Sequence, residues 1–130
     1  MFDPSPVSGN AVIIVDDDPS VCRALERQLR ANRLGSVSFT SACELLGGES
    51  WRDAGCFLLD IRMPQMSGVE LARRLAEAGS SAPVILMSAH VEESASAVAA
   101  AHAVAFLPKP LDEKPLVGAL RQALEPHSAA

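Results

Sequence analysis

Short apolar runs recur along this chain, and polar or amphipathic segments separate them. Uninterrupted runs of this length are typical of strands that are buried on both faces of a parallel sheet, where the alternation of apolar and polar residues is lost. One run is weaker than the others, and we expect that strand to be shorter or nearer an edge of the sheet. In chain order the runs are 11–15, 37–39 (the weaker one), 56–59, 83–87 and 103–107.

The segments between the runs have helical patterns. In the first segment Val21, Leu25 and Leu29 recur at i, i+4 and i+8, and arginines lie off this stripe. This spacing predicts an amphipathic helix over 19–32, with Asp18 as its N-cap. Four further helices are expected at 41–47, 67–79, 91–101 and 112–126.

The ends and faces of these helices are also predictable. Ser41 and Ser67 each stand three residues before a glutamate, which is the pattern of a capping box at a helix start. The alanine-rich segment 91–101 has a thin apolar stripe, so this helix is expected to be loosely held, and 50–55 is expected to be a polar loop. The inward residues predicted for the helices at 67–79 and 112–126 are Leu71, Ala72, Leu75 and Ala76, and Val117, Leu120 and Leu124.

A strand followed by a helix, five times over, predicts an α/β fold with a five-stranded parallel sheet. Because crossovers between parallel strands are right-handed, the carboxyl ends of all the strands should meet at one edge. We expect one domain over 11–126, preceded by a flexible leader at 1–10 and followed by a flexible tail at 127–130.

Composition narrows the class of protein. The chain has 130 residues, of which 48% are hydrophobic, which fits a packed domain and argues against disorder. Its formal net charge of −5 argues against a stand-alone nucleic-acid-binding protein, and the apolar runs are too short to span a membrane. Cys22, Cys43 and Cys56 lack metal-binding spacing and are expected to be buried, reduced thiols of a cytoplasmic protein.

Chemically useful side chains follow several of the predicted strands. Asp16 and Asp17 follow the first strand, Asp60 the third, Ser88 the fourth and Lys109 the fifth. Like charges in one cleft cost energy, and a hard divalent cation such as Mg²⁺ would compensate them. Carboxylates, a hard metal, an amine and a hydroxyl together form a site for phosphoryl oxygens, with a carboxylate as the nucleophile.

These residues lie in four short motifs that also occur, in the same order, in a known protein family. The motifs are Val15-Asp16-Asp17-Asp18, Leu59-Asp60-Ile61-Arg62-Met63-Pro64 with Ser67-Gly68, Ser88-Ala89, and Lys109-Pro110. In this order and spacing, over about 11–125, the chain resembles a response-regulator receiver domain of two-component signalling, the CheY-like family. The resemblance implies a doubly wound (βα)5, flavodoxin-like fold.

The resemblance also implies a role for each matching position. Asp60 would be the phosphoacceptor and Lys109 would contact the acyl phosphate, with a cis peptide bond to Pro110. Ser88 would move to bond a phosphate oxygen, and the rotamer of Phe106 would follow it, which would change the face formed by the fourth helix, fifth strand and fifth helix. The Mg²⁺ ligands would be Asp16, Asp17, Asp60 and the backbone carbonyl of Arg62.

The resemblance implies a regulatory switch that assists its own phosphorylation and dephosphorylation and is not a conventional enzyme. It also implies partners that deliver phosphate and partners that respond to it. Phosphate would come from a sensor histidine kinase, a phosphotransfer protein or a small acyl phosphate. A downstream effector or output domain would read the changed face, and activation would favour a homodimer. The Asp60 segment and 106–110 are also similar to FixJ-like receivers, although Cys22 and 101–103 depart from the common family pattern.

Two other functions use a similar arrangement. A phosphohydrolase of the haloacid-dehalogenase kind also has a strand-end aspartate nucleophile, but it needs an acid two residues later, where this chain has Arg62. A phosphorylation-independent interaction module would keep the fold but would not need these side chains. The intact set argues against this alternative; it consists of Asp16, Asp17, Asp60, Ser88 and Lys109. His90 follows Ser88 closely, yet nothing in the sequence supplies the third member of a catalytic triad.

Overall fold

The computed structural model of this chain describes residues 11–125. The leader expected at 1–10, the helix end expected at Pro126 and the tail expected at 127–130 lie outside the described residues. The strands are β1 (Ala11–Val15), β2 (Ser36–Phe39), β3 (Ala54–Asp60), β4 (Val84–Ser88) and β5 (Ala105–Pro108). The helices are α1 (Pro19–Ala31), α2 (Ala42–Gly47), α3 (Gly68–Glu77), α4 (Ser94–Ala101) and α5 (Glu113–Leu124), with short 3-10 turns at Ser50–Asp53 and Val91–Glu93.

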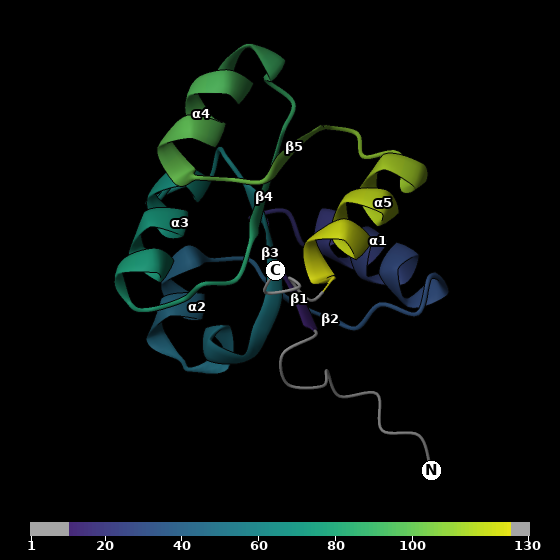
Figure 1. Cartoon of the computed structure of the whole chain (residues 1–130), viewed down its shortest axis with the longest axis horizontal. Helices are drawn as coiled ribbons and strands as arrows, with labels where there is room; N and C mark the ends of the chain where they lie inside the picture. The colour runs from purple at the N-terminus through teal and green to yellow at the C-terminus, as the bar shows by residue number, and fades with distance from the viewer. Residues whose placement is uncertain (1–10, 126–130) are drawn as a thin grey trace, which may run out of the picture.

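The five strands form one parallel sheet in the order β2-β1-β3-β4-β5, so the weak strand does lie at an edge. Helices α2, α3 and α4 cover one face, and α1 and α5 cover the other (Figure 1). Successive strand residues point to opposite faces and feed separate cores; Ile13 and Val15 join one, and Val12 and Ile14 the other. The predicted doubly wound α/β fold is confirmed.

The predicted helix starts are confirmed for α1, α2 and α3. The Asp18 carboxylate accepts a hydrogen bond of 2.9 Å from the Ser20 backbone N–H. The Ser41 and Ser67 hydroxyls accept hydrogen bonds from the Glu44 and Glu70 backbone N–H groups at 3.3 and 3.1 Å. Each side chain satisfies one of the amides that a helix start leaves unpaired.

Burial differs from the prediction at several positions. Cys43 and Ala76 are exposed, and Leu124 is only half-buried. In α1 the buried stripe contains Cys22, while Val21 is only half-buried. The rest of each predicted stripe is buried, and at these positions packing against the sheet decides which small or apolar residues face inward.

The segment predicted as a polar loop is a 3-10 turn that buries a tryptophan. The Trp51 ring is 7% exposed, and its indole N–H donates to the Gly48 carbonyl at 3.1 Å. The guanidinium of Arg52 lies 4.6 Å from the centre of the same ring. The ring therefore closes the core under the start of β3, and the loop prediction was wrong for these residues.

Helix α4 is weakly attached, as its sequence indicates. Its first turn is a separate 3-10 turn, and within the described chain no side chain caps its N-terminus. Ala97 and Ala101 are its buried residues, and alanine contributes little buried area. Among the described residues, no helix is both long and apolar enough to cross a membrane.

The turn after β3 requires a glycine. The Gly68 backbone N–H donates to the Ile61 carbonyl at 2.9 Å, and a Cβ atom at Gly68 would overlap the carbonyl oxygen of Asp60. The start of α3 therefore packs directly on the backbone that presents the Asp60 side chain.

Replacing Gly68 by alanine should lower the free energy of unfolding by about 1–3 kcal/mol, as other overpacking substitutions do, because backbone must move to admit the methyl group. Gly118→Ala is the matched control, because a Cβ built at Gly118 meets no described atom within 4 Å beyond the neighbouring residues and backbone of its own helix. It should leave stability unchanged or raise it by up to about 1 kcal/mol. Urea denaturation measures both, and equal effects of the two substitutions would contradict the close contact at Gly68.

Candidate functional site

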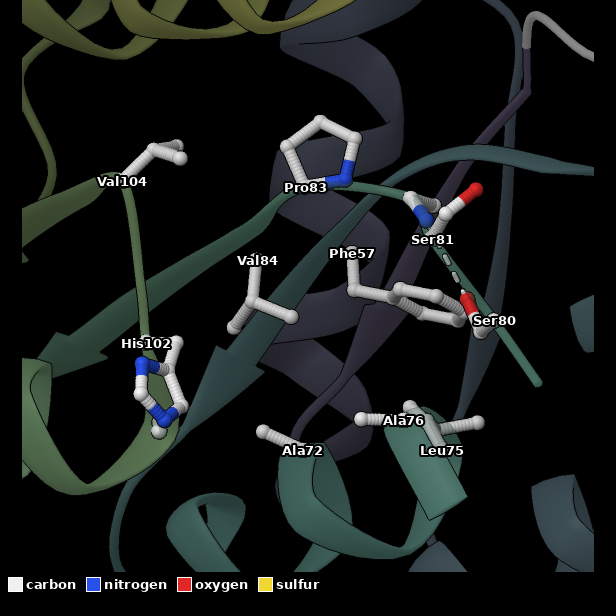
Figure 2. Close-up of a pocket in the computed structure, with 12 residues that line it drawn as sticks. Phe57, Ala72, Leu75, Ala76, Ser80, Ser81, Pro83, Val84, His102 and Val104 are labelled. Carbon is white, nitrogen blue, oxygen red and sulfur yellow. Dashed lines mark hydrogen bonds between the residues drawn. The ribbon is translucent and has the colours of Figure 1, made fainter. Parts of the chain in front are cut away.

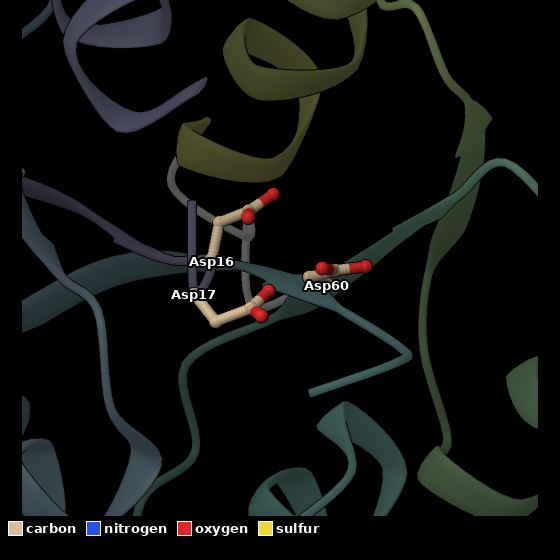
Figure 3. A group of neighbouring side chains, drawn as sticks. All are labelled: Asp16, Asp17 and Asp60. Atoms are coloured by element: carbon tan, nitrogen blue, oxygen red, sulfur yellow. The ribbon is translucent and has the colours of Figure 1, made fainter. Parts of the chain in front are cut away.

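Three aspartates meet at the carboxyl edge of the sheet. Asp60 ends the central strand β3 and is 5% exposed, whereas Asp16 directly follows β1 and is fully buried. Asp17 follows Asp16 and is exposed. One carboxylate oxygen of each residue lies within 4.8 Å of one from each of the other two, and Figure 3 shows the three side chains converging. The predicted gathering of these acids is confirmed.

Lys109 brings a positive charge to the two buried acids. Its ammonium lies 2.6 Å from an oxygen of Asp16 and 3.3 Å from an oxygen of Asp60. Its backbone N–H donates to the Ser88 carbonyl at 2.9 Å, which ties the loop after β5 to the end of β4. The peptide bond to Pro110 is cis, as expected.

The charges at this edge do not balance. Three carboxylates face one ammonium. Burial, followed by the nearby charge of Asp16, raises the pKa of Asp60, although Lys109 opposes this shift. Burial alone would lower the pKa of Lys109, but its hydrogen bond to Asp16 and the charges of Asp16 and Asp60 outweigh burial and raise it. The donor set of oxygens with excess negative charge is one that a hard divalent cation prefers.

The two predicted switch residues lie near this cluster but do not join it. Ser88 ends β4 and is 1% exposed, and its hydroxyl oxygen accepts a 2.9 Å hydrogen bond from the His90 backbone N–H. Phe106 is half-buried in β5 and packs against the core under α3 and α4. Its place in β5 pairs with Leu86 of β4. The switching roles of Ser88 and Phe106 stay predictions.

One ion pair near the site was not predicted. The Arg62 guanidinium binds the Glu93 carboxylate through two hydrogen bonds, of 3.1 and 3.0 Å. From the resemblance, only the backbone carbonyl of Arg62 is expected at the site. The pair could be predicted only from the strand order, because Arg62 follows β3, Glu93 follows β4, and these two strands are neighbours in the sheet.

Among the described residues, hollows are found at both ends of the sheet. Figure 2 shows one of about 280 Å³ between α3, the start of β4 and the loop before β5, where His102 is the only ionisable residue of the lining. It is remote from the acids because it borders the amino ends of the strands. The second, of about 410 Å³, is an apolar groove between α1 and the loop after β5 and includes Lys109, Pro110 and Leu111. This second groove adjoins the acidic cluster through Lys109.

No thiol joins the carboxylate cluster, although the Cys22 thiol donates to the Asp16 backbone carbonyl at 3.3 Å. Burial raises the pKa of the Cys56 thiol to about 12, and burial likewise raises the pKa of Cys22. Both are free and buried as expected, whereas Cys43 is free and exposed, which corrects the prediction that all three are buried.

Comparison with known proteins identifies related sequences. Residues 12–121 match the family model described as response regulator receiver domain. The chain is 39% identical over 118 residues to response regulator protein TmoT of Ectopseudomonas mendocina, an alignment that covers 89% of this chain and 53% of TmoT. It is 34% identical over 114 residues to transcriptional regulatory protein FixJ of Azorhizobium caulinodans, covering 87% of this chain and 54% of FixJ.

Solved structures show the same fold. The chain aligns with response regulator protein TrrA of Thermotoga maritima, solved in complex with Mg²⁺-BeF, with a TM-score of 0.78 over 88% of this chain and 99% of TrrA. The sequence identity is 23%, so this likeness concerns the fold alone.

The family model covers most of the chain, and the relatives TmoT and FixJ are each more than 30% identical to it. The chain spans about half the length of these two curated relatives. It belongs to the response regulator receiver domain family of two-component signalling.

Proposed function

We propose that this chain is a phosphorylation-activated signalling switch in which Asp60 accepts a phosphoryl group in a Mg²⁺-dependent reaction. The observation that carries the proposal is the position of the Asp60 carboxylate. It is nearly buried at the end of the central strand, beside two further acids and 3.3 Å from the Lys109 ammonium. A carboxylate in such a place can act as a nucleophile toward a phosphoryl group whose oxygens are held by the surrounding cations.

The proposed Mg²⁺ ligands are Asp16, Asp17, Asp60 and the backbone carbonyl of Arg62. The fit rests on the clustered carboxylate oxygens, on their charge in excess of Lys109, and on the raised pKa of Asp60, which burial and Asp16 cause. When bound, the ion would neutralise charge and orient the oxygens of the transferring phosphoryl group.

The chain's own residues carry the proposed reaction. An oxygen of Asp60 forms a bond to phosphorus as the bond between phosphorus and the donor breaks, and the bonding electrons leave with the donor. Lys109 already contacts Asp60, so it can neutralise charge on the acyl phosphate with little movement. The Ser88 hydroxyl would exchange its bond with the His90 N–H for one with a phosphoryl oxygen, which starts the switch.

The readout that we propose is a change in the face formed by α4, β5 and α5, with Phe106 following Ser88. The thin attachment of α4 supports this, because a weakly held element can shift at little cost. Receiver domains are regulatory signalling domains, and in this one the proposed chemistry serves its own phosphorylation and dephosphorylation.

The proposed phosphodonors are a sensor histidine kinase, a phosphotransfer protein or a small acyl phosphate, acting in the cytoplasm. The apolar groove between α1 and Lys109 offers a donor protein a surface beside the phosphoacceptor. The proposed recipient is an effector or output domain, since TmoT and FixJ are about twice as long as the matched region. Activation would favour a homodimer. A haloacid-dehalogenase-type hydrolase is disfavoured because Arg62, which cannot act as the acid, is bound to Glu93.

Labelling with acetyl phosphate tests the phosphoacceptor. With Mg²⁺ the wild-type chain should gain one phosphoryl group by intact-protein mass spectrometry, and Asp60→Asn should gain none, because an amide is not a nucleophile for this transfer. Asp18→Asn is the matched control, since it removes a nearby carboxylate but keeps a good N-cap. Asp18→Asn should be labelled like the wild type. Labelling of Asp60→Asn, or no labelling of the wild type, would contradict the proposal.

A second experiment tests the proposed metal ligands through the dependence of the free energy of unfolding on Mg²⁺ concentration. Binding to the folded state should raise the wild-type free energy of unfolding by about 1.4 kcal/mol for each tenfold increase in Mg²⁺ above its Kd. Asp17→Ala should flatten this dependence, whereas Asp18→Asn should keep it. Thermal unfolding over a Mg²⁺ series measures the slopes, and an unchanged slope for Asp17→Ala would show that Asp17 is not a ligand.

A further inference from the structure

Arg62 and Glu93 connect the phosphoacceptor loop to the start of α4. Arg62 lies two residues after Asp60, and Glu93 ends the 3-10 turn that leads into α4. The guanidinium Nε and a terminal nitrogen of Arg62 donate to separate oxygens of the Glu93 carboxylate, at 3.1 and 3.0 Å. Two parallel charge-assisted hydrogen bonds fix the relative position of the two segments more tightly than a single contact does.

The start of α4 has few other polar restraints. Glu93 occupies the N-cap position, but within the described residues no side-chain hydrogen bond caps this helix. The Ser96 hydroxyl donates to the Glu93 carbonyl at 3.3 Å, which is a contact inside the same turn. The contact between Glu93 and a different loop therefore adds a polar restraint at the start of α4, beside the packing of Ala97 and Ala101.

The two sides of the ion pair are anchored differently. Arg62 follows Ile61, whose backbone N–H donates to the Met87 carbonyl and whose carbonyl accepts from Gly68. These bonds hold the Arg62 side in place. On the other side, the Glu93 N–H donates to the His90 carbonyl at 3.1 Å, and the His90 N–H donates to the Ser88 hydroxyl at 2.9 Å.

This chain of contacts links the Ser88 hydroxyl to the ion pair. A Ser88 hydroxyl that turns toward Asp60 gives up its bond with the His90 N–H. The freed His90 segment would carry Glu93 with it through their backbone hydrogen bond, while Arg62 would stay with the end of β3. The ion pair is present in the arrangement in which Ser88 faces its own loop, and such a movement would separate its two partners.

We propose that the Arg62–Glu93 ion pair is a latch that holds α4 in its unphosphorylated position and opens when the Ser88 hydroxyl turns to a phosphorylated Asp60. The proposal rests on the proposed function. A latch that exists in one state only shifts the equilibrium toward that state, so it weakens the binding of any ligand that selects the other. Removing it should make phosphorylation-like ligands bind more tightly.

The test is the affinity for beryllofluoride in the presence of saturating Mg²⁺. Glu93→Gln should bind about two- to fivefold more tightly than the wild type, which is the range that an exposed ion pair supplies. Glu92→Gln is the matched control, because it removes the same charge one residue earlier and leaves the pair intact; its affinity should stay nearer the wild-type value. In an Arg62→Gln background Glu93→Gln should have no further effect, because no latch remains.

Two results would overturn the latch: equal gains for Glu93→Gln and Glu92→Gln, or a gain that persists in the Arg62→Gln background. Either would mean that only the net charge matters. Hydrogen exchange without ligand separates this failure from a failure of the proposed function. If the wild type binds no beryllofluoride, the proposed function fails, and with it the opening step. Faster exchange of the α4 amides in Glu93→Gln than in Glu92→Gln would then still show that the ion pair holds the start of α4, and equal exchange would refute the latch itself.

Discussion

The carboxyl edge of the sheet holds more negative charge than Lys109 can balance, and this imbalance governs the rest of the site. Two of the three carboxylates are almost completely buried, where the charged form is costly to maintain. The ammonium sits closer to Asp16 than to Asp60, at 2.6 against 3.3 Å. Asp60 is therefore the buried acid whose charge is less well compensated, which agrees with its raised pKa, caused by burial and by Asp16. This imbalance is the physical basis of the proposed Mg²⁺ site and of the proposed chemistry at Asp60.

The fold places this edge at the ends of well-packed strands and connects it to helix α4, which is loosely held. Strands β1 and β3 are buried along almost their whole length. Close packing of the core therefore holds the carboxyl ends of both strands in place. Helix α4 is different, since its buried residues are alanines and a bidentate ion pair connects its start to the loop after β3. A rigid site next to a loosely held helix is an arrangement in which a local charge change can move one element without disturbing the sheet.

Much of this could be predicted from the sequence, because apolar runs and capping residues are local signals. The runs located the central strands, and the Ser41 and Ser67 patterns located two helix starts. What could not be predicted depends on packing or on strand order. Cys43 is exposed because its neighbours Ala42 and Leu45 take the inward face of α2. Trp51 is an isolated apolar residue in a polar segment, and its burial follows from the shape of the core. Arg62 and Glu93 are 31 positions apart and meet because β3 and β4 are neighbours.

The pKa of Asp60 is the most direct measure of the charge imbalance. It can be followed by the ¹³C chemical shift of its carboxyl carbon during a pH titration of the metal-free chain, assigned with Asp60→Asn. We expect a pKa above the ordinary aspartate value, because burial and Asp16 disfavour the charged form, and we expect that pKa to fall when Mg²⁺ is added. A pKa at or below the ordinary value without the metal, or one that Mg²⁺ does not lower, would contradict this expectation.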